Sequence, residues 1–499
     1  MSNSSNAQGG EKWSSRWGFI AATIGMAIGT GNIWRFPRVA ANNGGGAFII
    51  AWTVALLIWS IPLLMAEMVI GKQSKAGTIG SFKKFVGKNY AWMGAFIAFV
   101  CFAIMSYYSV VMGWCLKYFM TAVSGGFNST TSVNDTMKIW ESFINSPAQT
   151  ISLHLVSIGI AVFVIYRGVT GGIEKTCKML IPSLFLILLF IAVRAAFLPN
   201  AVEGYKYLFT PDFSQLLSGK IWLEAFTQSA WSTGAGWGFI ITYSSYTSSD
   251  SDIGLNSFLT GFGNNMASIL AAMAIIPTIF ALSGSLAGAQ EAFTSGNTGL
   301  TFIYLASLFP TMGGGQLLAS LFFFAMAISA LSSLIAMLEV CTKILMDTGK
   351  TRQKASIIVG IAGFLVGIPS AYNIEFLNNQ DMVWGVALLI SGLFCAYALF
   401  KYGVEKARTD IINGPWADIY IGKWWSYCIY IFPALFSIVF IWWIYQSISW
   451  YPDTWYSPFE TYSAGTIIIQ ITIAILIIKG VNSRFVKAHE KGGENTNAS

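Results

Sequence analysis

The sequence predicts an all-α integral membrane protein with twelve transmembrane helices. Hydrophobic residues make up 55% of the chain and charged residues only 10%, and the mean hydropathy is +0.60. The apolar runs are about 20 residues long, which is the length of a membrane-spanning helix and not of a short alternating strand. Glycines and polar residues in the middle of the first and sixth runs predict that these two helices are broken.

The predicted spans follow one another without a long soluble insertion. They cover residues 17–41, 46–71, 90–123, 150–167, 176–198, 222–249, 255–285, 315–348, 355–372, 380–404, 426–447 and 462–480. We therefore divide the chain into a cytoplasmic N-terminal segment at 1–16, a first half with spans 1 to 5 at 17–198, an outside loop at 199–221, a second half with spans 6 to 10 at 222–404, spans 11 and 12 within 405–480, and a cytoplasmic tail at 481–499. Within the second half, 286–313 is predicted to be an outside lid, with a plain long loop as the alternative.

The distribution of positive charge predicts the orientation. An even number of spans places both termini on one side, and most of the 29 Lys and Arg residues lie on that same side. By the positive-inside rule, both termini are predicted to be cytoplasmic. The net charge of +7 follows from this rule, so we expect no nucleic-acid partner. The short outside loop at 124–148 favours the plasma membrane of a bacterium, that is, its inner membrane.

The first span contains residues that a lipid-facing helix would not tolerate. Gly25, Gly29 and Gly31 lie there together with Asn32 and Arg35. A glycine weakens a helix interior by roughly 0.5–1 kcal/mol, and a charge at the bilayer centre costs several kcal/mol more. A helix-packing face of small residues would explain Gly25 and Gly29 but neither Asn32 nor Arg35. We therefore expect a broken helix that lines a substrate and ion site.

Span 6 contains a second interruption of the same kind. Its middle reads Trp231-Ser232-Thr233-Gly234-Ala235-Gly236-Trp237-Gly238. Paired interruptions in matching positions are typical of transporters built from two halves in inverted orientation. The sequence therefore predicts a 5+5 inverted repeat with broken helices 1 and 6. Two extra C-terminal helices follow, which face lipid or form a homodimer surface.

Oxygen donors gather around these breaks without a matching set of carboxylates. Carbonyl, amide and hydroxyl oxygens with little net charge suit Na⁺ better than a divalent cation. The candidates are the backbone carbonyls of Gly25, Ala27 and Ile28, the amides of Asn32, Asn264 and Asn265, and the hydroxyls of Ser329, Ser332 and Ser333. For Ser332 and Ser333, the alternative is a hydrogen bond to a carbonyl of their own helix.

Charged and aromatic residues near the breaks indicate how a substrate would be held and enclosed. Half-helix N-termini favour a carboxylate, to which Tyr108 could donate its hydroxyl; packing alone is the alternative for this tyrosine. Arg35 has a candidate partner in Asp381, and this pair would close the outside path. Glu67 and Glu339 are intramembrane acids, which either function directly or accept N–H groups freed by the breaks.

The segment around the first break resembles the signature of a known transporter family. Gly31-Asn32-Ile33-Trp34-Arg35-Phe36-Pro37 is followed by Asn43-Gly44-Gly45-Gly46-Ala47-Phe48, as in the neurotransmitter:sodium symporter family. The resemblance runs at motif level from about Trp13 to Ala398 and continues through all the spans. It implies a symporter that couples Na⁺ entry to amino-acid uptake by alternating access; a channel or sensor on the same scaffold is the alternative. No nucleophile–base pair or metal-ligand cluster is visible in the sequence, so we do not expect an enzyme.

The resemblance also implies the residues of each site. The first sodium site would use Ala27, Asn32, Ser232 and Asn264, and the second would use Gly25, Ile28, Ser329, Ser332 and Ser333. The substrate pocket would be lined by Ala27, Gly29, Gly31, Ile104, Tyr108, Trp231, Ser232, Gly234, Trp237, Ser333 and Met337. The gates would be Arg35 with Asp381, Trp231 and Gln228 outside, and Tyr246 with Asp347 inside. Gly172 and Pro182 match an element of span 5 that similar transporters unwind.

The chain departs from the family pattern at the inner gate and in the pocket. Gly10 stands at the place of the family's inner-gate Arg, and Lys12 is the candidate substitute, although an ammonium is not a guanidinium. Gly29 stands where monoamine carriers hold an aspartate, which suits an amino acid that brings its own carboxylate. Trp231 and Trp237 replace phenylalanines and narrow the pocket, while neighbouring glycines return some volume. We expect a small neutral amino acid such as glycine or alanine, with a larger aromatic one as the alternative.

Chloride is a further expectation from the resemblance. Chloride-dependent relatives surround the anion with a tyrosine, two serines and an asparagine, whereas many bacterial members place an acid in span 7. Here Ser268 stands at the position of that acid, with Ser232 and Asn264 nearby, and Trp52 holds the place of the tyrosine. These four residues favour chloride binding beside two sodium ions.

Overall fold

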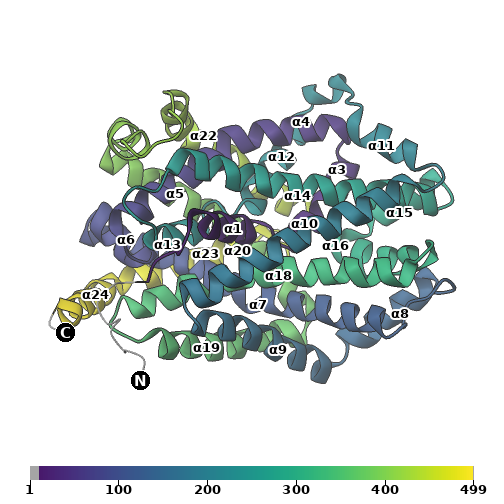
Figure 1. Cartoon of the computed structure of the whole chain (residues 1–499), viewed down its shortest axis with the longest axis horizontal. Coiled ribbons are helices and arrows are strands. Elements are labelled where there is room, and N and C mark those ends of the chain that lie inside the picture. Colours follow the sequence, from purple (N-terminus) through teal and green to yellow (C-terminus); the bar gives the residue numbers. More distant parts are fainter. Residues whose placement is uncertain (1–10, 498–499) are drawn as a thin grey trace.

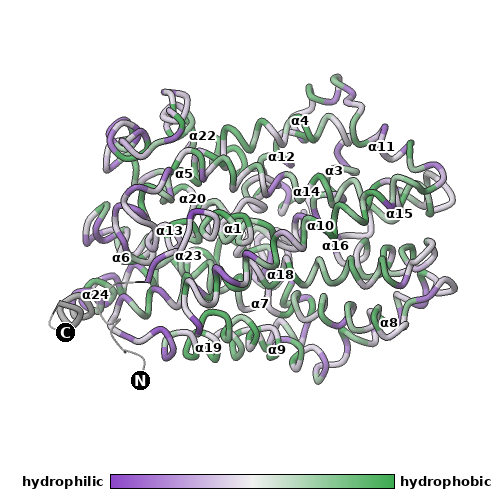
Figure 2. Tube along the Cα trace, in the orientation of Figure 1, coloured by the Kyte–Doolittle hydropathy of each residue, from purple (hydrophilic) through white to green (hydrophobic). Residues whose placement is uncertain are grey.

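The structure, a computed structural model, describes residues 11–497, and the secondary structure of this part of the chain consists of helices joined by turns and loops, without a strand. α6 (Thr78–Phe85) and α24 (Asn482–Asn497) lie at one end of the bundle, which we call the inner end (Figure 1). α8 (Val133–Ile144), α11 (Ala201–Phe209) and α15 (Leu286–Thr294) lie at the opposite, outer end. Figure 2 shows hydrophilic segments mainly at these two ends and hydrophobic residues along the middle of the long helices, as a membrane-spanning bundle requires.

Nine helices of the described chain are long and apolar enough to cross a membrane by themselves. They are Gly46–Ser74 (which ends in α5, Ile61–Ser74), Lys88–Val123 (with α7, Ala91–Val123), Pro147–Tyr166 (α9), Val169–Ala196 (with α10, Lys175–Ala196), Ile253–Leu282 (α14), Gly315–Met346 (α18), Arg352–Tyr372 (α19), Ile374–Tyr402 (α20) and Trp424–Trp450 (α22). The other three spans are the two broken ones and α23 (Ala464–Gly480), which has 17 residues and bends by 49° into α24. The twelve-span fold predicted from the sequence is confirmed.

Span 1 is interrupted where the sequence predicts. α1 (Arg16–Ala27) is followed by two extended residues, Ile28 and Gly29, with ψ angles of 99° and −175°. α2 (Thr30–Ile33) and α3 (Arg35–Asn42) then continue the span toward the outer end. The last carbonyls of α1 therefore lack partners within their own helix and can bind other groups.

Span 6 is interrupted between α12 (Gly219–Ser232) and α13 (Phe239–Ser245). Gly234, Gly236 and Gly238 have φ angles of 74°, 86° and 78°, a region that side chains other than glycine rarely enter. The Glu67 carboxylate on α5 accepts hydrogen bonds from the N–H groups of Gly236 at 2.5 Å and Gly238 at 3.1 Å. Of the two alternatives for Glu67, the structure therefore supports the second, in which the acid satisfies the backbone of a break.

The centre and the edge of the bundle differ sharply in burial. In each helix, we compare the 18-residue stretch that is most apolar. In α18, 83% of this stretch is buried inside the protein, whereas in α22 only 22% is buried. α18, which carries the predicted sodium-site serines, therefore lies at the core. α22 keeps most of its apolar surface exposed, as expected for one of the two extra C-terminal helices.

The segment 286–313 is helical for most of its length and not a plain loop. It contains α15, α16 (Gly296–Thr298), a π-helical turn at Gly299–Leu305 and α17 (Ala306–Leu308). Arg38 Nε donates to Asn297 Oδ1 at 2.7 Å, and Asn42 Nδ2 donates to the Phe293 carbonyl at 2.9 Å. The segment is thus attached to α3, and its action as a lid stays a prediction.

Candidate functional site

A cavity of about 690 Å³ lies between the two breaks. It extends toward the outer end between Arg35, Arg38 and Asp381. All eleven residues predicted for the substrate pocket are in its lining: Ala27, Gly29, Gly31, Ile104, Tyr108, Trp231, Ser232, Gly234, Trp237, Ser333 and Met337. Residues from four different spans are therefore brought to one site.

Gly29 and Tyr108 meet at the wall of this cavity. The Tyr108 hydroxyl accepts a hydrogen bond from the Thr30 N–H at 3.0 Å, so its own proton is available to an acceptor in the cavity. A Cβ on Gly29 would lie 2.9 Å from the Tyr108 hydroxyl and 3.2 Å from Ser333 Oγ. Any side chain at position 29 would therefore displace these two groups.

Asn264 contacts the other three residues predicted for the first sodium site, which are Ala27, Asn32 and Ser232. One atom of its side-chain amide lies 2.8 Å from the Ser232 carbonyl oxygen and 3.1 Å from the Ala27 carbonyl oxygen. Asn32 Nδ2 lies 2.7 Å from the same amide. Asn32 and Asn264 are 1% and 0% exposed, so these oxygens are removed from water.

The Ile28 carbonyl joins the residues predicted for the second sodium site. Ser332 Oγ and Ser333 Oγ both donate to it at 3.3 Å, across the gap between α18 and α1. Ser332 Oγ also donates to the Ser329 carbonyl at 3.0 Å, which is the bond within its own helix that the sequence left open. Gly25 is in none of these hydrogen bonds and faces α10 instead.

The residues predicted for chloride supply hydrogen-bond donors in a buried region. Ser268 Oγ accepts from Asn32 Nδ2 at 2.8 Å and is completely buried. The Trp52 side chain is 1% exposed, and its indole Nε1 has no hydrogen-bond partner among the described residues. A buried N–H without an acceptor is uncommon because it costs about 1–3 kcal/mol.

The predicted outer gate is not closed by an ion pair. Arg35 Nη1 donates to Gln228 Oε1 at 2.9 Å, and its guanidinium lies 4.2 Å from the centre of the Trp231 ring. Asp381 accepts a hydrogen bond from the Tyr107 hydroxyl at 2.9 Å. Both charged groups line the cavity, which separates them. The expected contact between Arg35 and Asp381 is therefore absent in this conformation.

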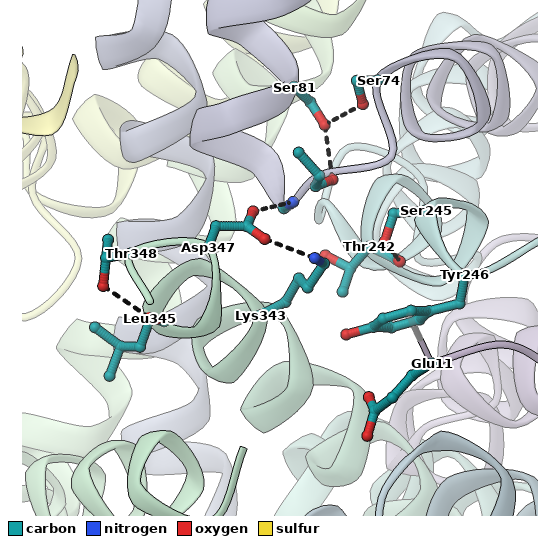
Figure 3. Close-up of polar contacts among 12 residues, drawn as sticks. Glu11, Ser74, Ser81, Thr242, Ser245, Tyr246, Lys343, Leu345, Asp347 and Thr348 are labelled. Atoms are coloured by element: carbon teal, nitrogen blue, oxygen red, sulfur yellow. Dashed lines mark hydrogen bonds and ion pairs between the residues drawn. The ribbon is translucent and has the colours of Figure 1, made fainter. Parts of the chain in front are cut away.

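In the predicted inner gate, Tyr246 and Asp347 do not bond to each other but to different partners. Asp347 accepts from Lys343 Nζ at 2.6 Å and from the Gly77 N–H at 2.6 Å, so both of its oxygens are engaged (Figure 3). Tyr246 lies apart from it and donates to Glu339 Oε1 at 2.5 Å. Lys12 is exposed and its side chain makes no ion pair within the described chain, so its role as the substitute for the missing Arg stays a prediction. Gly10, at the place of that Arg, lies outside the described residues.

The sequence did not reveal two charged residues that form ion pairs at the inner end, Glu11 and Arg352. Arg352 donates to both oxygens of Glu339, at 2.6 and 2.8 Å, and also contacts the carboxylate of Glu11. Glu11 and Arg352 lie 341 positions apart, in polar segments where charges are ordinary, so no local pattern marked them. Glu174 is a similar case, because it accepts from the Ser14 N–H at 2.8 Å.

The span 5 element begins with a π-helical turn at Val169–Glu174 and continues into α10, which contains Pro182. A Cβ on Gly172 would lie 2.0 Å from the Val164 carbonyl oxygen, so only glycine fits this approach. Unwinding of the element stays a prediction.

A family model of the sodium:neurotransmitter symporter family matches residues 10–138 and 133–488. The chain belongs to this family. An uncharacterized sodium-dependent transporter of Methanocaldococcus jannaschii is 31% identical over 431 residues, which cover 84% of this chain and 87% of the relative. The sodium-dependent serotonin transporter of Drosophila melanogaster is 25% identical over 505 residues, with 91% and 80% covered.

The structural comparison agrees with the sequence. The crystal structure of MhsT in complex with L-phenylalanine superimposes with a TM-score of 0.75 at 29% identity, and the match covers 87% of this chain and 99% of MhsT. The protein is thus a sodium-dependent symporter of this family and a multi-pass membrane protein that binds a small-molecule substrate.

Proposed function

We propose that this symporter carries a neutral amino acid together with Na⁺ by alternating access. The observation that carries the proposal is Gly29, whose position against Tyr108 and Ser333 leaves no room for a side-chain acid at the break. A substrate bound there brings its own carboxylate, for which the Tyr108 hydroxyl has a proton available. Each Na⁺ that enters down a potential of 100 mV supplies about 2.3 kcal/mol, before any concentration gradient.

The two oxygen clusters support binding of two sodium ions. The Asn264 amide can donate its N–H group to the carbonyls of Ala27 and Ser232, and when it is turned over it places its oxygen within 3.1 Å of both carbonyls. Three such oxygens repel one another unless a cation lies between them, and they carry no net charge, which suits Na⁺. At the second cluster, the Ile28 and Ser329 carbonyls with the hydroxyls of Ser332 and Ser333 offer a similar neutral set. The backbone carbonyl of Gly25 stays a proposed fifth ligand of this second sodium site.

Chloride is the second ion that we propose, at Trp52, Ser232, Asn264 and Ser268. The indole N–H of Trp52 has no partner among the described residues, and the Ser268 hydroxyl makes only a long hydrogen bond of 3.4 Å to the Asn264 carbonyl, so both can donate in a buried region without a carboxylate among these four residues. Donors of this kind fit an anion, and the absence of an acid at Ser268 leaves room for its negative charge.

The pocket supports a small substrate, with a larger hydrophobic one as the second candidate. The point that a Cβ on Gly234 would occupy lies only 3.2 Å from Met26 Sδ, so Met26 takes up volume that the glycine leaves. Trp231 and Trp237 add two large walls. In favour of a larger substrate, the structure of MhsT, with 29% identity, was determined with L-phenylalanine.

Equilibrium binding with the purified protein tests this proposal. A panel of radiolabelled neutral amino acids is offered in NaCl, KCl and sodium gluconate. We expect saturable binding of glycine or alanine only with Na⁺, weakened when gluconate replaces chloride. Binding that is equal in KCl and NaCl would contradict the sodium sites, and exclusive binding of phenylalanine or leucine would select the second candidate.

A further inference from the structure

Two exposed lysines flank the start of α7 at the inner end, and we call them the inner lysine pair: Lys401 and Lys479. Lys401 lies in the last turn of α20, and its Nζ is 5.6 Å from the centre of the Tyr90 ring. Lys479 lies in the last turn of α23, and its Nζ is 5.9 Å from the centre of the Trp92 ring. Since Tyr90 and Trp92 are two positions apart in the chain, both ammonium groups lie beside one short stretch of backbone.

The start of α7 is bound to the elbow between α23 and α24. Asn482 Oδ1 accepts a hydrogen bond from the Trp92 N–H at 2.8 Å, and Asn482 Nδ2 donates to the Lys88 carbonyl at 3.2 Å. The Trp92 ring also packs edge-on against Phe394 of α20, with ring centres 5.2 Å apart. The three helices α7, α20 and α23 therefore hold the aromatic rings beneath the inner lysine pair in a fixed arrangement.

The inner lysine pair has no acidic partner in the described part of the chain. Neither lysine forms an ion pair there, whereas the nearby Lys88 is paired with Glu490 at 2.7 Å. The polar groups next to the Lys401 ammonium are the hydroxyls of Tyr90 and Tyr397, each of which has a proton to donate. Two positive charges with hydroxyl donors suit an anion that has several oxygens, such as a phosphate group.

The side chains next to Lys479 on the way to the bilayer centre are apolar and exposed. Leu476 precedes Lys479 by three positions and is 64% exposed, and Ile473, three positions before Leu476, is 52% exposed. Residues three positions apart are neighbours on a helix surface, so this apolar surface begins directly beside the ammonium group. A ligand with a phosphate and acyl chains can occupy both parts at once, whereas a free phosphate gains nothing from the apolar part.

A lysine at the end of a span can also direct its ammonium group toward water without any ligand. This explains a single lysine at a helix end. It does not explain why lysines from two different spans lie over aromatic rings beside the start of a third span. Basic pockets between spans on the cytoplasmic side of a membrane are typical binding sites for anionic lipid headgroups.

We propose that the inner lysine pair binds the headgroup of an anionic phospholipid in the leaflet at the inner end. The two ammonium groups hold the phosphate, and the hydroxyls of Tyr90 and Tyr397 donate to its oxygens. The acyl chains lie along Leu476 and Ile473 of α23. The proposal goes beyond the proposed function and does not depend on the substrate that is carried, so its test needs no transport.

Native mass spectrometry of the full-length protein in detergent tests this site. Phosphatidylglycerol is titrated, and the fraction of lipid-bound protein gives an apparent Kd. Lys401→Gln combined with Lys479→Gln should weaken binding about thirtyfold, because each lysine near an anionic lipid contributes a factor of about five. Lys401→Arg combined with Lys479→Arg keeps both charges and should retain binding.

The matched control is Lys350→Gln combined with Lys354→Gln. It removes the same charge from two exposed lysines in and beside the loop between α18 and α19, and should leave the apparent Kd unchanged. In the parent protein, phosphatidylcholine with the same acyl chains should bind much more weakly than phosphatidylglycerol. An excess of inorganic phosphate should not displace the lipid.

Three outcomes would overturn the proposal. Equal weakening in the control and in the Lys401/Lys479 variant would show that only the overall charge of the inner end attracts the lipid. Equal affinity for phosphatidylcholine would show that the headgroup charge is not recognised, and displacement by inorganic phosphate would identify the ligand as a free anion. Elution as a monodisperse peak at the volume of the parent protein confirms that each variant is folded. If the double variant does not fold, Lys479→Gln alone, with an expected loss of about fivefold, decides the test.

Discussion

The outer and inner ends of this symporter hold their charges in opposite ways. At the outer end, Arg35 and Asp381 each bond to a neutral partner, Gln228 and Tyr107, and a cavity separates them. At the inner end, Arg352 is bonded directly to carboxylates in a buried group. The conformation is therefore accessible from the outer end and closed at the inner end.

The two ends also differ in the energy that their contacts carry. A solvated ion pair contributes about 0–1 kcal/mol, whereas removal of one member of a buried pair costs about 3–5 kcal/mol. If Arg35 and Asp381 meet when the outer end closes, their contact would be a weak one of this solvated kind, which suits a gate that opens to water in each cycle. At the inner end, the Arg352–Glu339 pair is buried, so its separation would be costly.

The largest effect is expected in the cavity between the two ends. Gly29→Asp should abolish amino-acid binding, because its carboxylate would displace Tyr108 and repel the carboxylate of the substrate. Equilibrium binding checks this. Gly219→Asp is the matched control, since nothing lies within 4 Å of a Cβ there, and it should bind as the parent does. Retained binding in Gly29→Asp would show that the substrate carboxylate lies elsewhere.

At the inner end, Glu339→Gln should lower stability strongly. The change leaves Arg352 with only the partly exposed Glu11 as counter-ion, and we expect a loss of about 3 kcal/mol. The fraction of monodisperse protein after heating in detergent measures this loss. A midpoint equal to that of the parent would mean that the buried pair contributes nothing.

The sodium sites should respond with a loss of affinity and not of folding. Asn32→Asp removes the amide N–H group that donates to Asn264 and Ser268 and adds a negative charge that repels the carboxylate of the substrate, and Ser333→Ala removes a hydroxyl from the Ile28 carbonyl. Each variant is expected to raise the Na⁺ concentration for half-maximal amino-acid binding about tenfold. This corresponds to a loss of about 1.4 kcal/mol of binding free energy. Unchanged Na⁺ dependence in both variants would refute the assignment of these sites.

The smallest effect on stability is expected at the outer end. Asp381→Asn removes a charge that lines the cavity and keeps a group able to bond to Tyr107, so heating midpoints should correspond to a change within about 0.5 kcal/mol. Uptake should nevertheless slow, because closure over the substrate loses the partner of Arg35. If this variant lost as much stability as Glu339→Gln, the contrast between the two ends would be wrong.

Local sequence was sufficient to predict the breaks, and the pocket needed the resemblance as well. Glycines and Asn32 stand out against an apolar run within a few residues, and lipid cannot satisfy broken backbone, so their meaning did not depend on the fold. The resemblance then located pocket residues such as Ile104 and Met337, which ordinary periodicity would have assigned to helix packing.

The charged group at the inner end, formed by Glu11, Glu339 and Arg352, could not be predicted in this way. Charges such as Glu11 and Arg352 are ordinary in loops flanking a membrane span, and only the folded chain brings them into contact. The engagement of Asp347 carried a local signal, because Lys343 lies four residues before it on the same helix. The role of Glu67 needed the fold, which places it beside Gly236 of another span.

Concentrative uptake measures the coupling of amino-acid transport to Na⁺. Purified protein in sealed liposomes receives a radiolabelled neutral amino acid under an inward Na⁺ gradient, with K⁺ or choline replacing Na⁺ in parallel. We expect accumulation above the external concentration only with the Na⁺ gradient, and collapse of that accumulation when the gradient is dissipated. Equilibration to the external concentration without accumulation, or uptake that is indifferent to the cation, would contradict this coupling.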